Sequence, residues 1–99
     1  ALRVEIYRNP DKYTYTDDMA KLIGLSRSRF SIVYKEVFKI SPKNDLINAR
    51  ISKASYLLSS ETPSLAKISE ECGYQSIYHF IRQFRDVMGI TPGKYRKNH

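Results

Sequence analysis

The chain has 99 residues, a formal net charge of +7, 41% hydrophobic residues and 27% charged residues. This hydrophobic content suits one folded domain and excludes an intrinsically disordered chain, and no apolar run reaches the roughly 20 residues that cross a bilayer. A positive charge of this size attracts polyanions, so nucleic acid is one candidate partner; the alternative is a basic protein with no such partner.

The single cysteine, Cys72, excludes an internal disulfide framework and a cysteine-rich zinc site. It suits a reducing compartment, so we expect a cytoplasmic protein. We also expect no metal and no cofactor. The N-terminal segment lacks the continuous apolar stretch of a signal peptide. The chain also lacks an initiating Met, and we therefore expect a fragment or a processed chain.

The first predicted elements are short. A helix is predicted over residues 2–8, followed by a loop over 9–12. Thr16 is a suitable N-cap for a helix over 17–23, because its hydroxyl can accept a backbone N–H of the first turn. Gly24 then suits the end of that helix, since glycine tolerates the left-handed conformation found there.

Two longer helices are predicted next. The first follows Ser26 as its N-cap, and its apolar residues share one helical face: Phe30, Val33, Tyr34 and Val37. The second runs from Pro42 to about Ser59, with Ser41 as its cap and proline in its first position. Its apolar residues recur at helical spacing: Leu46, Ile47, Ile51, Ala54, Leu57 and Leu58. At 1.5 Å per residue this helix is about 27 Å long.

A break at 61–63 separates these helices from a second series. Ser64 is a suitable cap for a short helix over 65–72, and Gly73 suits its end. Ser76 is the expected cap of a longer helix, whose apolar face is formed by Phe80, Phe84 and Val87. One or two final helical turns are predicted over 91–97.

The second series repeats the first at a constant offset of 50 residues. The matching pairs are Ser26–Ser76, Phe30–Phe80, Tyr34–Phe84, Lys35–Arg85, Val37–Val87, Ile40–Ile90, Ser41–Thr91 and Pro42–Pro92. Each unit is a short helix, a glycine turn and a longer helix, which is the helix-turn-helix pattern. We therefore predict one all-α domain made of two helix-turn-helix subdomains, over 1–41 and 61–99, joined by a linker helix over 42–60.

Outward positions near the N-terminal end of each longer helix are the candidates for contact with DNA bases. They are Arg27, Ser28, Ser31, Ile32 and Lys35 in the first unit, and Ile77, Tyr78, Ile81, Arg82 and Arg85 in the second. Arg82 is the strongest candidate for a two-bond contact with guanine; a phosphate contact or an ion pair with Glu70 or Glu71 is the alternative. Exposed isoleucines can contact thymine methyl groups, or they pack at the turn.

Other residues are predicted to hold the DNA backbone without distinguishing its sequence. The capped starts of two helices direct backbone amides outward, and nearby cations add positive charge. The predicted backbone contacts are Arg27, Lys35, Ser41, Lys43, Arg85, Thr91, Lys94, Arg96 and Lys97. For any one lysine in this group, the alternative is a solvated surface residue.

The same residues resemble the AraC/XylS family of bacterial transcription regulators. The second unit carries the resemblance most specifically, with GYQSIYHF at 73–80, RQFR at 82–85 and GITPGKYR at 89–96. The first unit and the helix after Pro42 are also similar to the family, so the resemblance covers nearly the whole chain.

This resemblance implies a domain of about seven helices that binds double-stranded DNA and recruits or assists RNA polymerase at promoters. It also implies an effector or dimerisation domain elsewhere in the same chain. The family's base contacts correspond to Ser28, Ser31, Ile32, Ser76, Ile77, Tyr78, Ile81 and Arg82. Ile32 stands where many members of the family carry arginine.

Three other functions compete with this interpretation. A DNA-repair methyl acceptor would need a reactive thiolate, but Cys72 is alone and is better interpreted as a small buried core residue, so we predict that the chain is not an enzyme. A protein-interaction module would expose a large apolar patch. RNA is less favoured, because the major groove of an RNA helix is too narrow for a protein helix.

Overall fold

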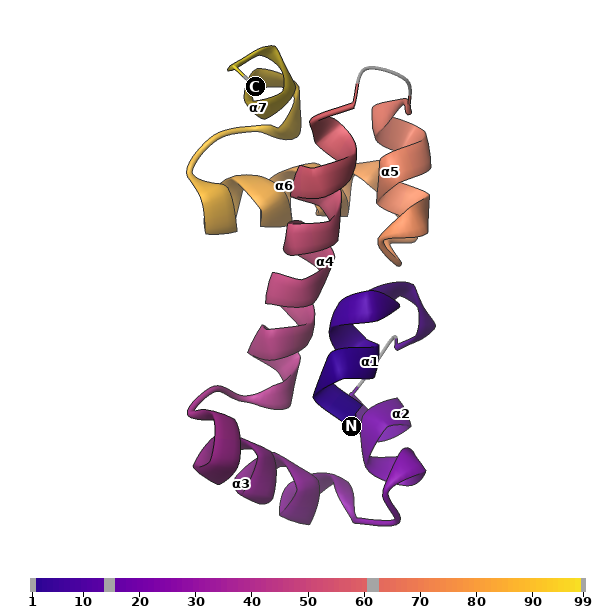
Figure 1. The fold of residues 1–99 in the computed structure, drawn as a ribbon, viewed down its shortest axis with the longest axis vertical. Coiled ribbons are helices and arrows are strands. Elements are labelled where there is room, and N and C mark those ends of the chain that lie inside the picture. The colour runs from indigo at the N-terminus through magenta and orange to yellow at the C-terminus, as the bar shows by residue number, and fades with distance from the viewer. Residues whose placement is uncertain (1, 14–15, 61–62, 99) are drawn as a thin grey trace.

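A computed structural model describes residues 2–13, 16–60 and 63–98, apart from the side chains of Thr16, Asp17 and Leu22. All regular structure within these residues is helical, as predicted (Figure 1). The elements are α1 (Leu2–Arg8), the 3-10 helix η1 (Pro10–Lys12), α2 (Thr16–Leu22), α3 (Arg27–Phe38), α4 (Pro42–Leu58), α5 (Leu65–Glu71), α6 (Ile77–Met88) and α7 (Pro92–Asn98). No helix in this part of the chain is long and apolar enough to cross a membrane.

Two predicted elements differ from the structure. The segment over 9–12 is a 3-10 turn and not a loop, because Pro10 occupies the first helical position, where its fixed φ is favourable. Thr16 is the first residue of α2, one position before the predicted helix start. The residue that precedes it, where a cap would stand, is outside the described residues.

The longest helix, α4, forms the axis of the molecule. The structure measures 42 × 22 × 21 Å, and α4 runs along the longest dimension (Figure 1). Helices α1, α2 and α3 surround its first half, and α5, α6 and α7 surround its second half. Both α3 and α6 cross α4 near its ends, and in this view both run from right to left.

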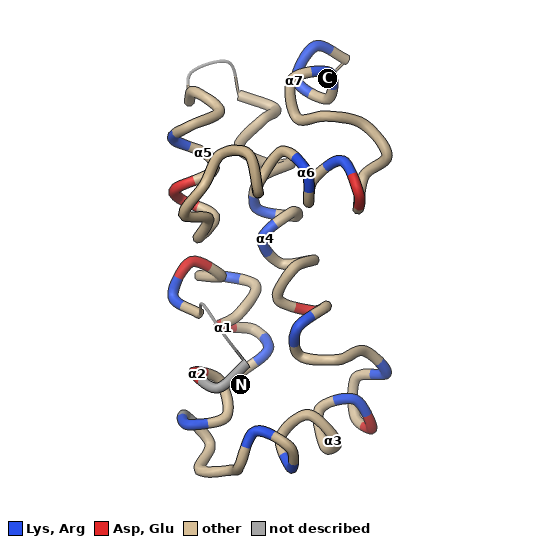
Figure 2. Tube along the Cα trace, turned by 180° about the vertical axis from the view of Figure 1, so that it is seen from behind, with Lys and Arg blue, Asp and Glu red and all other residues tan. Residues whose placement is uncertain are grey.

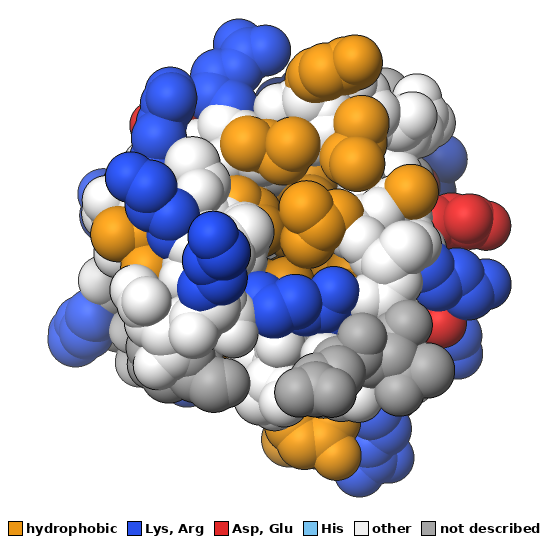
Figure 3. Space-filling model, turned by 90° about the horizontal axis from the view of Figure 1, so that it is seen from above, with side chains coloured by type: hydrophobic (Ala, Val, Ile, Leu, Met, Phe, Trp, Pro, Cys, Tyr) orange, Lys and Arg blue, Asp and Glu red, His pale blue; other side chains and the backbone are white. Residues whose placement is uncertain are grey.

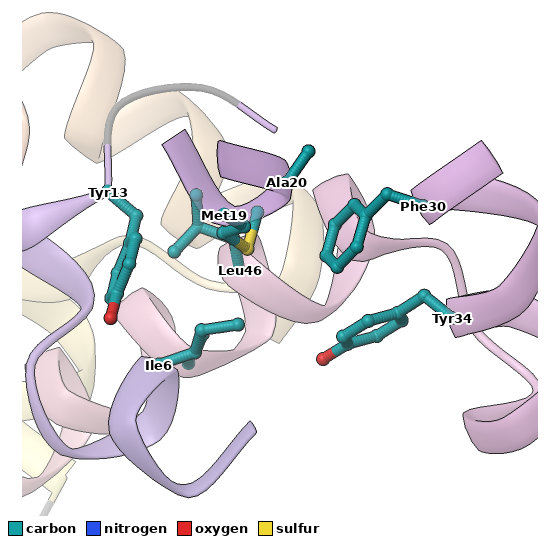
Figure 4. Close-up of a cluster of buried hydrophobic side chains, with 8 residues drawn as sticks. Ile6, Tyr13, Met19, Ala20, Phe30, Tyr34 and Leu46 are labelled. Carbon is teal, nitrogen blue, oxygen red and sulfur yellow. The ribbon is translucent and has the colours of Figure 1, made fainter. Parts of the chain in front are cut away.

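Two separate hydrophobic cores lie along α4. The first is made of Ile6, Tyr13, Met19, Ala20, Phe30, Tyr34, Leu46 and Ala49 (Figure 4). The second is made of Ile51, Ala54, Leu58, Ile68, Cys72, Tyr74, Phe80 and Phe84. Successive turns of α4 therefore supply side chains first to one core and then to the other.

The apolar faces of α3 and α6 are shorter than the sequence predicts. Val37 is 63% exposed and Val87 is 44% exposed, although both were expected to face the core. Because α3 and α6 cross the ends of α4, their middle turns contact the core and their last turns project past it (Figure 1).

The two glycine turns have the same backbone conformation but different surroundings. Gly24 has φ +70°, and a Cβ atom added there would meet no atom within 4 Å. Gly73 has φ +96°, and a Cβ atom there would lie 2.9 Å from the Cα atom of Asp11 in η1. The second turn is therefore pressed against the N-terminal half of the molecule, whereas the first turn faces open space.

We predict that Gly73→Ala destabilises the protein more than Gly24→Ala. The change at Gly24 costs about 1–2 kcal/mol, because only the left-handed backbone conformation opposes it. The change at Gly73 adds a further cost of about 1–3 kcal/mol, because the backbone of η1 must move. Urea unfolding of both variants measures the difference. Equal losses would show that η1 does not press on this turn.

Candidate nucleic-acid interface

Both long helices of the two units begin at a serine cap, as predicted. The Ser26 hydroxyl accepts a hydrogen bond from the backbone N–H of Arg29 at 3.2 Å, and the Ser76 hydroxyl accepts one from the N–H of His79 at 3.5 Å. The cap fixes the first residue of each helix and therefore fixes which side chains follow the turn.

The same two positions anchor each of these helices. Phe30 and Tyr34 on α3 are buried, and so are Phe80 and Phe84 on α6. Figure 4 shows the rings of Phe30 and Tyr34 pointing from α3 toward the first core. Because the anchors have equal spacing after each cap, the outward positions of α3 and α6 are equivalent as well.

The predicted base contacts divide into exposed and half-buried groups. In α3, Ser28 and Ile32 are exposed, with Ile32 56% exposed, while Ser31 is half-buried. The residues of the second unit that are exposed are Ser76, Tyr78 and Arg82; those that are half-buried are Ile77 and Ile81. Arg82 forms no ion pair with Glu70 or Glu71 within the described residues, so the ion-pair alternative has no support in the structure, while the phosphate alternative stays open.

Ile81 is the candidate whose surroundings differ most from the prediction. It packs against the second core, together with Leu65 and Tyr95. Only part of its side chain can therefore be offered to a base. Tyr78, at 77% exposure, presents a larger accessible side chain at the start of the same helix.

Most of the predicted backbone contacts are exposed cations. These are Arg27, Lys35, Lys43, Arg85, Lys94 and Lys97. Figure 2 shows Lys and Arg residues along α3, α6 and α7, and Figure 3 shows several of them beside hydrophobic side chains at the α7 end. The hydroxyls of Ser41 and Thr91 accept N–H groups of Asn44 at 3.2 Å and of Lys94 at 3.3 Å, so both cap their helices as predicted.

Arg96 is occupied within the protein. Its guanidinium donates to the carbonyl oxygen of Leu58 at 3.3 Å and to that of Ser60 at 2.9 Å. These carbonyls lie at the C-terminal end of α4, where backbone acceptors lack helical partners and the helix dipole favours a cation. The structure thus gives Arg96 a capping role that the sequence did not predict.

Asp45 connects α3 to α1 and α4. Its carboxylate is fully buried and accepts two hydrogen bonds from Arg3, at 2.8 and 3.3 Å, and one from the Tyr7 hydroxyl at 2.5 Å. The hydroxyl of Tyr34 on α3 donates to the other carboxylate oxygen. Side chains from α1 and α3 thus bind the same carboxylate on α4, and these bonds fix the position of α3 relative to α1 and α4.

The charge state of this network follows from its contacts. Burial by itself would raise the pKa of the Asp45 carboxyl, but hydrogen bonds from Arg3, Tyr34 and Tyr7 outweigh it and hold that pKa below its usual value. The pKa of Tyr34 is raised, first by burial and then by its bond to Asp45. The network therefore contains a carboxylate, a guanidinium and neutral phenols at neutral pH.

The lone cysteine is part of the second core. Cys72 is fully buried, and burial raises the pKa of its thiol to about 11. A thiol of this kind is protonated at neutral pH and is a poor nucleophile. The interpretation of Cys72 as a small core residue is confirmed. Within the described residues, no group of three His, Cys, Asp or Glu side chains could hold a metal ion.

Comparison with known proteins identifies the family. Residues 19–98 match the model of a helix-turn-helix domain of the AraC type. The chain belongs to the AraC-type helix-turn-helix family. Members of this family are the DNA-binding domains of transcription regulators and are not enzymes.

Relatives and solved structures agree with this assignment. The MmsAB operon regulatory protein of Pseudomonas aeruginosa is 33% identical over 79 residues, which are 80% of this chain and 26% of that protein. The C-terminal domain of the two-component response regulator yesN from Fusobacterium nucleatum is 28% identical, with a TM-score of 0.88 over 96% of this chain and 94% of that one.

A third comparison concerns a complex with DNA. The DNA-binding domain of the global transcriptional factor AdpA, solved in complex with a target DNA, has a TM-score of 0.91 over 98% of this chain and 87% of that one. At 22% sequence identity, this structural likeness shows that the AraC-type domain shares its fold. The chain spans only 26–32% of the length of the first curated relatives that it matches.

This AraC-type domain buries two charged residues, Asp45 and Arg50, that the sequence did not predict as site or core residues. Both lie on α4 among apolar residues at helical spacing, and that placement is the one signal that could have identified them. Their partners are 11 to 42 residues away in the sequence, so no local pattern predicts the contacts.

We predict that Asp45→Asn lowers the free energy of unfolding by about 1–3 kcal/mol at pH 7, because buried donors lose a charged acceptor. Since the pKa of Asp45 is lowered in the folded state, its contribution is present above the unfolded pKa of about 4 and is lost as pH falls through the folded value. The difference between wild type and variant should therefore shrink below pH 4.

Urea unfolding between pH 7 and pH 2.5 measures this difference. Asp86→Asn is the matched control, because Asp86 is exposed on α6 and the substitution has the same chemistry. The role assigned to Asp45 would be refuted by equal losses in the two variants at pH 7.

Proposed function

We propose that this domain binds double-stranded DNA in a sequence-specific manner by inserting α3 and α6 into adjacent segments of the major groove. One observation carries the proposal: two serine-capped helices, anchored by equivalent aromatic residues, lie at opposite ends of α4 and run in the same direction (Figure 1). A recognition helix offers its N-terminal outward side chains to base edges, and those positions are accessible on both helices.

The dimensions of the domain support two contacts with one face of the duplex. Successive major-groove segments on one side of B-DNA lie about 34 Å apart. The 17 residues of α4 span about 25 Å, and the whole molecule is 42 Å long because α3 and α6 lie across the ends of α4. A single domain is thus long enough to contact two groove segments about one turn apart.

The two helices carry different side chains for base contact. Arg82 would bind guanine through two hydrogen bonds, with the exposed Tyr78 and Ser76 beside it. In α3, the exposed Ser28 and Ile32 and the half-buried Ser31 offer a hydroxyl or an apolar contact instead. Ile77 and Ile81 are half-buried, and we assign them contacts with thymine methyl groups through their accessible atoms.

The remaining cations would neutralise phosphates without distinguishing bases. This group contains Arg27, Lys35, Lys43, Arg85, Lys94 and Lys97, together with the helix starts at Ser41 and Thr91. Arg96 would mainly stabilise the end of α4 through its two hydrogen bonds, and the phosphate contact predicted for it would be secondary.

We further propose that the domain is one part of a larger regulator that works in the bacterial cytoplasm. The matched region is only 26–32% of the length of its curated relatives, which leaves room for an effector or dimerisation domain in the same chain. RNA polymerase is the proposed protein partner, because the relatives include an operon regulator and a transcriptional activator.

A protein-interaction module is the second candidate, and one observation favours it. Val4, Tyr7 and Phe38 are exposed, and together with Arg3 they line an open pocket between α1 and the end of α3.

The two functions differ in their dependence on salt, because DNA affinity falls steeply with salt concentration when phosphates are neutralised. Selection of binding sites from a random duplex pool tests the first function directly, and recovery of no preferred sequence would exclude it.

We predict that Arg82→Ala weakens binding to the selected duplex by about 1–3 kcal/mol and relaxes base preference at one position. The reason is that guanine loses two directional hydrogen bonds that no other base can replace. Fluorescence anisotropy with the selected duplex and its single-base variants measures both effects.

Arg85→Ala is the matched control, since Arg85 is exposed on the same helix and is a predicted phosphate contact. It should weaken binding to every duplex equally and make the salt dependence shallower by about one unit. If Arg82→Ala behaves in the same way as this control, then Arg82 contacts only phosphate.

A further inference from the structure

The two hydrophobic cores meet at one residue of α4. Leu46 and Ala49 belong to the first core, while Ile51 and Ala54 belong to the second. Between them, Arg50 is only 8% exposed. A charged side chain thus occupies the boundary between the two helix-turn-helix units.

Arg50 contacts both units at once. Its guanidinium donates a hydrogen bond to the carbonyl oxygen of Tyr13 at 2.5 Å, and Tyr13 is part of the first core. The same guanidinium lies over the ring of Tyr74, 5.2 Å from its centre, and Tyr74 is part of the second core. One rigid, planar group therefore links the two units by a directional bond on one side and a stacked ring on the other.

Neighbouring contacts cross the same boundary. Lys53, one helical turn further along α4, lies 3.4 Å from the carboxylate of Asp11 and donates to the carbonyl of Glu71 at 3.0 Å. Gly73 packs against the backbone of Asp11. The η1 segment of the first unit and the turn over 71–74 of the second are thus held together beside Arg50.

A buried cation is a costly choice for this position. Burying a charge costs several kcal/mol, and apolar residues of similar volume often stabilise a core more than buried ions do. Here no carboxylate forms a hydrogen bond with Arg50 within the described residues, and its Nε atom has no partner there. The contribution of Arg50 is better explained by geometry. Its hydrogen bond to Tyr13 and its contact with the Tyr74 ring are both directional, so together they favour one arrangement of the two units.

We propose that Arg50 is a positioning residue that fixes the orientation of α6 relative to α3, and thereby the spacing between the two DNA segments that the domain binds. This inference rests on the proposed function, since spacing has meaning only if both helices bind DNA. Each base pair added between two such segments shifts the second segment along the duplex axis and rotates it around that axis. A domain of fixed geometry therefore tolerates few spacings, whereas a hinged domain tolerates several.

The first experiment needs no DNA and tests the orientation alone. Glu36→Cys and Asp86→Cys place spin labels at equivalent exposed positions on α3 and α6, while the buried Cys72 stays unlabelled. Double electron–electron resonance then gives the distribution of distances between the labels. We expect a narrow distribution in this labelled parent, a broader one with Arg50→Met, and an intermediate one with Arg50→Lys, which keeps the charge but loses the planar group.

Leu57→Ala is the matched control for lost stability. Leu57 packs against the second core from the last turn of α4, about two turns beyond Arg50. Its distance distribution should stay as narrow as that of the labelled parent at a temperature where all variants are folded. The proposal is overturned if Arg50→Met stays equally narrow, or if Leu57→Ala broadens the distribution as much as Arg50→Met does.

The second experiment measures spacing preference on duplexes that differ by one base pair between the two selected segments. Wild type should lose about tenfold or more in affinity at a wrong spacing, and Arg50→Met less than about threefold. An unchanged preference in Arg50→Met would overturn the role of Arg50. Failure of the wild-type protein to prefer any duplex would instead exclude the proposed function, and the distance distributions would still decide whether Arg50 sets the orientation.

Discussion

One helix, α4, completes both hydrophobic cores, and the rest of the structure depends on this sharing. A unit of about 40 residues is too small to bury a core of its own without help. Leu46 and Ala49 close the first core, and Ile51, Ala54 and Leu58 close the second. Because α4 is continuous, unfolding of the half that completes one core also loosens the neighbouring turns that complete the other core. The two units are therefore expected to fold as one cooperative domain, with α3 and α6 carried at the two ends of a stiff spacer.

At one buried site the internal repeat preserves the positions but not the chemistry. In the first unit, Tyr34 of α3 donates a hydrogen bond to the buried carboxylate of Asp45. The equivalent residues of the second unit are Phe84 and Tyr95, whose rings pack edge to face at 5.5 Å. The aromatic pair completes itself, whereas the carboxylate also needs Arg3 from α1. This difference explains why the first unit needs α1 at this site, whereas Tyr95 of α7 completes the equivalent site of the second unit.

The sequence predicted the helices, their serine caps and the exposed faces of α3 and α6, because these features depend on residues within a few positions of one another. It could not predict the capping role of Arg96, whose carbonyl partner in Leu58 is 38 residues away. Helical periodicity also placed Val37 and Val87 on the core face, since periodicity defines the direction of a side chain but not how far the core extends along the helix. The sequence therefore failed to predict burial where tertiary contacts determine it, namely for charged residues that are buried and apolar residues that are exposed.

The helices α3 and α6 have equivalent positions but carry different side chains toward DNA. Ile32 on α3 and Arg82 on α6 occupy the same position relative to their caps, and both are exposed. An isoleucine offers only apolar contact, whereas an arginine can form two hydrogen bonds with guanine. Under the proposed function the two DNA segments then differ in sequence and in their share of the binding energy, so the site has no palindromic symmetry. A site of this kind can be bound in one orientation only, and the domain would therefore fix the direction in which the remainder of the regulator faces along the DNA.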